Sequence, residues 1–291
     1  QDMPGENARN TQYYEKGNCI TYDLNIAYNA VKKLLDIYSG KINVIEVLNE
    51  PDDMTEMDTA DRYAALLKVA SIAASENNDD VMISLSGLAK SNGIFAQRLL
   101  QNDIGNYIDI YDTHYYRNYL AGEEYIETPD TIDNFMGDAT AYGLSNKKLW
   151  MSEYGFRAEY ENTDNSDLSK PQFIQAARTA PIALIRANKS GVDKLFWFIH
   201  GYLKEDGKNG YGTFNSDHTP NYVYSALSAF TNALGNAGYS REIEADGADI
   251  CIYSDGTEEN RNRHHRMRQD RADPSYSRVR AESKCGADRI L

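Results

Sequence analysis

Several features that would narrow the function at once are scarce in this sequence of 291 residues. It contains only three cysteines, Cys19, Cys251 and Cys285, and their wide separation rules out a CxxC or metal-ligand spacing. We interpret them as incidental thiols. No stretch approaches the roughly 20 consecutive apolar residues that a membrane-spanning helix needs, so we expect no membrane partner.

Positive charge is also scarce. The chain has 30 lysines and arginines against 44 acidic residues, and its formal net charge is −14 at neutral pH. Nucleic acids and anionic membrane surfaces are bound through basic patches, so we expect neither as a partner. The phosphate-binding motifs G-x-G-x-x-G and G-x-x-x-x-G-K-[ST] do not open any predicted helix, which argues against a nucleotide-binding sheet. A neutral substrate fits this charge balance better.

Helical and strand patterns alternate along most of the chain. Short apolar runs between the helices indicate a parallel sheet, either a barrel or an open doubly wound sheet. Apolar residues at helical spacing predict helices over 24–38, 59–75, 94–101, 132–142, 171–189 and 222–234. The predicted strands are 44–50, 81–85, 108–114, 148–153 and 194–199. Residues 1–23 are polar and read as a loop.

The last part of the chain differs in composition. One or two further strands are predicted within 243–254, and the segment 260–291 then carries eight arginines, one lysine and four acidic residues. This segment has almost no apolar periodicity, so we expect it to be disordered. Two interpretations of this segment are open: a basic arm that binds nucleic acid, and the translation of an out-of-frame segment. We favour the second.

Polar side chains stand where the predicted strands end. The first strand ends at Glu50, because Pro51 cannot continue a sheet ladder and favours an extended conformation for the residue before it. The alternative is a solvated glutamate in a Pro-Asp-Asp turn. Glu153 ends the fourth predicted strand, and His114 ends the third. In a parallel α/β barrel all such strand ends open on one face, so these side chains are expected to converge.

Two converging carboxylates are the minimum equipment for cleaving a glycosidic bond. One carboxylic acid protonates the leaving oxygen, while the other carboxylate attacks the anomeric carbon or activates water. The same pair could bind a metal instead. No third ligand at a fixed spacing accompanies the pair, so we expect neither a metal nor another cofactor.

The motifs around these glutamates resemble those of a known group of enzymes, the clan A retaining glycoside hydrolases. Val47-Leu48-Asn49-Glu50-Pro51 is similar to their strand-four motif, and Leu149-Trp150-Met151-Ser152-Glu153-Tyr154-Gly155 is similar to their strand-seven W-x-x-E-x-G. The segment 109–117 resembles the strand-six sequence that ends in H-x-Y, and Phe196-Trp197 resembles the tryptophan of strand eight. The order of these motifs matches over residues 24–235. The sequence as a whole most resembles the β-xylosidase and α-L-iduronidase family and its cellulase-like relatives. Leu48 departs from this pattern, since many relatives have tryptophan there.

This resemblance implies a partial (β/α)8 TIM barrel that hydrolyses a carbohydrate substrate. Glu50 would be the general acid/base and Glu153 the nucleophile of a retaining reaction. Asn49 would hydrogen-bond the sugar 2-hydroxyl, and Trp197 would form the floor of the sugar site. Tyr116 or His114 would orient Glu153. We expect Glu46, on the same strand as Glu50, to be a buried structural carboxylate.

The resemblance also sets expectations for the organisation of the chain. Residues 1–236 would be the partial barrel with strands four to eight, residues 237–259 a remnant of a β domain, and residues 260–291 the disordered tail. Strands one to three would be missing, which leaves the activity of this chain open. The alternatives are a noncatalytic carbohydrate-binding protein and an inactive fragment on the same scaffold. The family resemblance implies a secreted or periplasmic protein.

Overall fold

The structure is a computed structural model of the whole chain, and it divides into two compact units. It describes residues 23–53, 59–77, 80–90, 93–119, 137, 139–159, 170–205, 209–245, 248–254, 262–268, 282–283 and 289–290. All but the last residue of the predicted loop over 1–23 and most of the predicted helix over 132–142 lie outside these residues.

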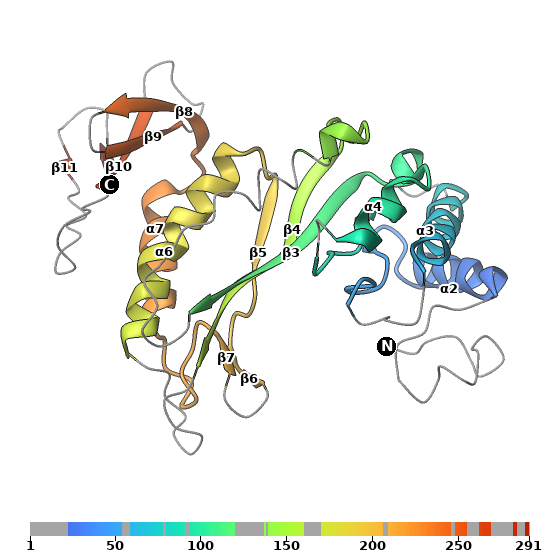
Figure 1. The fold of residues 1–291 in the computed structure, drawn as a ribbon, viewed down its shortest axis with the longest axis horizontal. Coiled ribbons are helices and arrows are strands. Elements are labelled where there is room, and N and C mark those ends of the chain that lie inside the picture. Colours follow the sequence, from blue (N-terminus) through green and yellow to red (C-terminus); the bar gives the residue numbers. More distant parts are fainter. Residues whose placement is uncertain are drawn as a thin grey trace. The chain divides into compact units, whose positions relative to one another are not determined.

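The first unit contains a parallel sheet with helices against it (Figure 1). Its strands follow the order β1-β2-β3-β4, and β5 pairs with β4, so five strands form a curled half-barrel sheet. Parallel pairing is seen between β1 and β2, β2 and β3, and β4 and β5. The strands are β1 (Val44–Glu46), β2 (Met82–Ser84), β3 (Ile110–Tyr119), β4 (Lys148–Glu159) and β5 (Lys194–Trp197). This mixed α/β arrangement is consistent with the predicted partial barrel.

The helices of the first unit begin and end close to the predicted positions. They include α2 (Leu24–Ile37), α3 (Ala60–Ser75) and α4 (Ile94–Leu100), whereas the short 3-10 helix η2 (Ile104–Asn106) was not predicted. Asp23 caps α2 by accepting a hydrogen bond of 2.9 Å from the backbone N–H of Asn25. The most buried helix is α3, which packs against α2 and α4 (Figure 1).

A tyrosine of α3 forms hydrogen bonds with the chain segments that follow two neighbouring strands. The hydroxyl of Tyr63 donates to the carbonyl of Val47 over 3.0 Å and accepts from the N–H of Ser86 over 2.8 Å. Tyr63 is fully buried, so its hydroxyl needs such partners. The chain segments that follow β1 and β2 are therefore fixed to the same helix. The core around it is apolar and includes Leu35, Leu67, Leu85, Leu88 and Leu99.

The first predicted strand is much shorter than expected. β1 ends at Glu46, and the chain then leaves the sheet, with φ of +70° at Leu48 and +43° at Glu50. The prediction that Pro51 holds Glu50 in an extended conformation at the strand end is therefore wrong. The preference of the residue before a proline for an extended conformation is overridden by contacts between side chains of this loop and a distant part of the chain.

Two other predicted strands are longer than expected. β3 continues to Tyr119 instead of ending at His114, and β4 continues to Glu159 instead of ending at Glu153. Both candidate site residues thus lie within strands. The continuing residues of β4 are paired at Ala158 and Glu159 with β7 (Asn209–Gly212), a partner that the sequence analysis did not predict.

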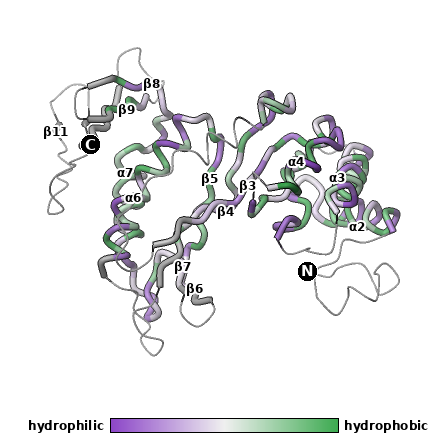
Figure 2. The backbone as a smooth tube through the Cα atoms, viewed as in Figure 1, coloured by the Kyte–Doolittle hydropathy of each residue, from purple (hydrophilic) through white to green (hydrophobic). Residues whose placement is uncertain are grey.

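The second unit is built around two long helices and two antiparallel hairpins. Helices α6 (Lys170–Lys189) and α7 (Tyr222–Leu234) match their predicted spans, and Figure 2 shows hydrophobic and hydrophilic residues mixed along both. Strands β6 (Tyr202–Glu205) and β7 form one hairpin. Strands β8 (Gly238–Ala245) and β9 (Ala248–Ser254) form the other. Their core contains Ile185, Phe230, Leu234, Cys251 and Tyr253, and Cys251 packs there as a small apolar residue.

Three short strands fall in the segment predicted to be disordered. β10 (Asn262–Arg268) pairs antiparallel with β9, and β12 (Arg289–Ile290) pairs with both β10 and β11 (Glu282–Ser283). At these residues the structure differs from the prediction. The reason is that a strand edge offers backbone donors and acceptors to a neighbour of any composition. The rest of 260–291 lies outside the described residues.

None of the helices in the described part of the chain combines the length and the apolar character that a membrane span requires.

Candidate active site

Glu50 is presented by a loop that is fixed by two aspartates. Asp52 accepts hydrogen bonds from the backbone N–H groups of Ala89 and Lys90, over 2.9 and 2.6 Å. Asp53 makes an ion pair of 2.6 Å with the Lys90 ammonium. The carbonyl of Glu50 accepts a hydrogen bond from the N–H of Asp53, which closes a tight turn. These contacts to the segment after β2 stabilise the left-handed backbone at Glu50, which costs about 1 kcal/mol or more for a non-glycine residue.

Glu153 is presented by β4, at an irregularity of the strand. Met151 pairs with Leu195 and Tyr154 with Trp197, so β4 contains one residue more than β5 between these two pairs. Such a β-bulge re-aims side chains, which otherwise alternate between the two faces of a strand. As a result, both Ser152 and Glu153, although consecutive, reach the same imidazole ring.

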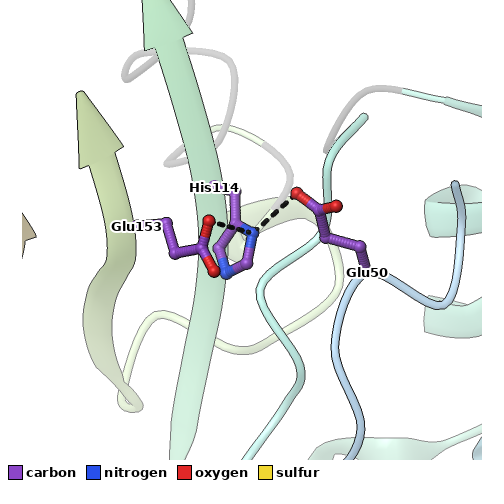
Figure 3. A group of neighbouring side chains, drawn as sticks. All are labelled: Glu50, His114 and Glu153. Atoms are coloured by element: carbon purple, nitrogen blue, oxygen red, sulfur yellow. Dashed lines mark hydrogen bonds and ion pairs between the residues drawn. The ribbon is translucent and has the colours of Figure 1, made fainter. Parts of the chain in front are cut away.

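That ring belongs to His114, which lies between the two glutamates (Figure 3). Its Nδ1 is 2.8 Å from Oε1 of Glu50 and 3.5 Å from Oε2 of Glu153. Its Nε2 is 3.0 Å from Oγ of Ser152. Only 1% of the His114 side chain is exposed, against 15% for Glu50 and 24% for Glu153. The ring is therefore a buried link between two partly accessible carboxylates.

Tyr116, which lies on the same strand as His114, also contacts Glu153. Its hydroxyl donates a hydrogen bond to Oε2 of Glu153. Residues two apart on a strand face the same side, which explains how His114 and Tyr116 both reach Glu153. The predicted H-x-Y pair is thus brought to this carboxylate by β3.

The carboxylates of Glu50 and Glu153 are close to each other. One oxygen of each, together with one ring nitrogen of His114, belongs to a set of atoms that all lie within 4.8 Å of one another. Three such donors are also able to contact one metal ion, so a candidate third ligand does lie beside the carboxylates, and the expectation of no bound metal stays a prediction. The sequence spacing could not show it, because the histidine comes from a different strand.

Burial and charge shift the pKa values of the groups beneath this site. Burial lowers the pKa of His114, but the hydrogen bond with Glu50 and the negative charges of Glu153, Glu50 and Asp112 outweigh it and raise this pKa above its ordinary value. Burial, followed by the charge of Glu46, raises the pKa of Asp112 to about 7. The pKa of Glu46 is also raised, mainly by burial. These residues form a compact, electrostatically coupled group.

Comparison with known proteins agrees with this architecture. No protein-family model and no curated protein sequence matches the chain. Solved structures do match. A glucosidase from Croceicoccus marinus superposes with a TM-score of 0.57 at 16% identity, covering 80% of this chain and 54% of its own. A family 39 glycoside hydrolase from Bacteroides cellulosilyticus gives 0.60 at 17% identity, with 86% and 54% covered.

A family 39 β-xylosidase from Caulobacter crescentus is similar in the same way, with a TM-score of 0.58 at 17% identity and with 80% and 51% of the two chains covered. These matched proteins are clan A glycoside hydrolases. The chain has their fold. It spans about half the length of each of them. The family resemblance predicted from the motifs is thereby confirmed at the level of the fold.

Two further residues were predicted to belong to the site, Asn49 and Trp197. Asn49 is exposed and directly precedes Glu50. Trp197 is partly buried at the end of β5, with its ring 5.6 Å from that of Tyr154. The roles of Asn49 and Trp197 stay predictions.

Three residues at the site were not singled out by the sequence analysis. Ser152 and Asp112 were not considered, although their positions beside Glu153 and His114 in the motifs were a usable signal. The backbone N–H of Ser152 donates to Asp112 over 2.9 Å, which fixes β4 to β3 beneath the site. Gly87 gave no signal at all, because its role depends on close approach to a residue from another strand.

Proposed function

We propose that this chain is a glycoside hydrolase that cleaves O-glycosidic bonds of a β-linked glycoside or polysaccharide by retaining double displacement. The observation that carries the proposal is the pair of carboxylates. Retaining enzymes hold their two carboxyl groups only about 5 to 5.5 Å apart, whereas inverting enzymes leave roughly 6.5 to 9.5 Å for a water molecule. The oxygens of Glu50 and Glu153 that lie within 4.8 Å support the shorter arrangement.

Glu153 is assigned as the nucleophile. It attacks the anomeric carbon while the bond to the leaving oxygen breaks, and a glycosyl ester forms. The nucleophile has to be ionised and correctly aimed. The hydroxyl of Tyr116 and the ring of His114 both contact its Oε2, and they support this role by holding the oxygen in place.

Glu50 is assigned as the general acid/base. It donates its proton to the leaving oxygen in the first step, and in the second step it takes a proton from the water that attacks the ester. Its loop position, with 15% of the side chain exposed, supports contact with a leaving group that enters from solvent. Asn49 and Trp197 are proposed to contact the sugar.

The names of the matched proteins support a carbohydrate substrate. They include a glucosidase and a β-xylosidase, so aryl β-xylosides and aryl β-glucosides are the first substrates to try. The direct test is inactivation with 2-deoxy-2-fluoro aryl glycosides of both sugars, followed by peptide mass spectrometry. We expect a glycosyl adduct on Glu153 and none in the Glu153→Gln variant.

A noncatalytic carbohydrate-binding protein on the same scaffold is the second candidate, since the fold alone does not establish catalysis. It predicts that xylo- or gluco-oligosaccharides bind while no residue is labelled. Sugar binding in calorimetry together with an unmodified Glu153 would therefore decide against the hydrolase.

A further inference from the structure

Glu46 is a carboxylate beside His114 that the proposed reaction does not use. It is the last residue of β1, and its Oε1 lies 4.0 Å from Nε2 of His114. The same oxygen accepts a hydrogen bond of 3.0 Å from the backbone N–H of Gly87. Its side chain is 32% exposed, so Glu46 is partly buried, less so than the buried structural carboxylate expected from the sequence. Glu46 therefore sits at the edge of the ring opposite to the edge that contacts Glu50.

Gly87 brings the backbone into close contact with the same ring. A Cβ atom at this position would lie 2.0 Å from both Cδ2 and Nε2 of His114, and 2.9 Å from Oγ of Ser152. No side chain fits there. Gly87 thus has two effects at once: it leaves space for the ring, and its N–H fixes the carboxylate of Glu46 next to that ring.

The ring is consequently held from both edges. On the Nδ1 side are Glu50 from its loop and Glu153 from β4. On the Nε2 side are Ser152 and Glu46. A ring that carries hydrogen on both nitrogens can donate in both directions at once.

The proposed reaction gives this anchoring a purpose. When the glycosyl ester forms, Glu153 loses its negative charge, and Glu50 gains one by giving up its proton. Negative charge therefore moves from one neighbour of Nδ1 to the other. A ring held only by these two neighbours would be attracted toward whichever of them carries the charge, whereas the carboxylate of Glu46 takes no part in the proposed reaction and lies at the other edge of the ring.

We propose that Glu46 and Gly87 are positioning residues that form a fixed seat for the His114 ring, so that its Nδ1 stays between Glu50 and Glu153 while charge moves between them. This inference rests on the proposed function for its effect on turnover. The seat itself can be observed without turnover.

The first test compares Glu46→Ala and Glu46→Gln. The alanine variant removes the acceptor of the Gly87 N–H, and a ring that moves by about 1 Å should lower kcat by up to about 100-fold. KM for an aryl glycoside should change far less, because Glu46 does not touch the substrate. The glutamine variant keeps an acceptor for Gly87 and should recover most of the loss. Glu76→Gln is the matched control, since Glu76 is an exposed carboxylate that accepts from Tyr28.

The second test reads the ring directly. The ¹⁵N chemical shifts of the His114 imidazole, recorded at fixed pH, should change in Glu46→Ala and stay unchanged in Glu76→Gln. Gly87→Ala should disturb them as well, whereas Gly137→Ala should not, because a Cβ at Gly137 meets nothing within 4 Å. Circular dichroism checks that each variant is folded, and the Glu46 variants keep the test valid if Gly87→Ala does not fold.

The outcomes separate this inference from the proposed function. Wild-type kcat in Glu46→Ala, or unchanged His114 shifts in that variant, would overturn the seat. A wild-type chain that hydrolyses no aryl glycoside and is not labelled would instead contradict the proposed function. In that case the ¹⁵N shifts alone decide on the seat.

Discussion

The two candidate catalytic glutamates are held in opposite ways. Glu153 lies within β4, where the backbone is paired to a neighbouring strand on each side of the bulge. Glu50 lies in a loop with φ of +43°, and side chains from the same loop fix it to the segment after β2. Backbone hydrogen bonds between strands hold Glu153 in position, whereas the position of Glu50 depends on the contacts of a few carboxylates in its loop. The two positions should therefore respond differently to substitution.

The largest effect should separate the two roles. Replacing Glu153 by alanine should reduce hydrolysis of every aryl glycoside by about 10⁴-fold or more, because no ester can form. Replacing Glu50 by alanine should cost about 10² to 10⁴-fold, and less for leaving groups that need no protonation. Steady-state rates over a series of substituted phenyl glycosides measure this difference. Equal losses for all leaving groups in both variants would contradict the assignment of roles.

The loop should be more sensitive than the strand to loss of an aspartate. Asp52→Ala removes the acceptor of two backbone N–H groups, and the resulting displacement of Glu50 should lower kcat by up to about 100-fold. Asp193→Ala is the matched change at the strand, since Asp193 accepts from the N–H of Leu149 at the start of β4. It should affect thermal stability more than kcat. Similar kcat values for the two variants would remove the contrast between loop and strand.

Tyr116→Phe should have a smaller effect, confined to Glu153. A hydrogen bond to a charged group contributes about 1.5 to 3 kcal/mol, which corresponds to roughly 10 to 100-fold in rate if it is needed in the transition state. Tyr28→Phe removes a tyrosine hydroxyl from another glutamate, Glu76, at an exposed position, and serves as the control. Rates of inactivation by the fluorosugar report on this step. An unchanged rate in Tyr116→Phe would show that the hydroxyl does not assist Glu153.

The last effect concerns stability and its dependence on pH, and not the catalytic rate. The pKa of Asp112 is raised to about 7, so the folded state binds a proton that the unfolded state has released above roughly pH 4. This contribution to stability is fully present below about pH 4 and is lost as the pH rises through 7, by at most about 4 kcal/mol. Asp112→Asn should flatten this decline in urea titrations from pH 4 to pH 8. A decline of the same size in both proteins would assign it to other groups.

The sequence predicted the helices far better than the loop that carries Glu50. The span of α7 was predicted to the residue, because helical spacing and capping are recorded in neighbouring residues. The conformation of Glu50 depends on contacts to Ala89 and Lys90, which local pattern cannot reveal. The β6–β7 hairpin was missed because its strands are short and lack apolar alternation.

For the site, the motifs pointed to the two glutamates, and His114 and Tyr116 do contact Glu153, while the roles of these residues stay predictions. The motifs could not identify the neighbours that act across strands. Glu46 and Gly87 meet His114 only through pairing of three different strand segments. Their importance depends on distance in space, and nothing in their own neighbourhood of the sequence records it.

The bulge in β4 makes the site sensitive to the number of residues as well as to their identity. Between Met151 and Tyr154 the strand carries one residue more than its partner. Deleting Ser152 would leave the two strands with the same number of residues between these pairs. It would move Glu153 into the place of the serine, with no change to the glutamate itself. The direction of the Glu153 side chain therefore depends on the length of this stretch as well as on the residues in it.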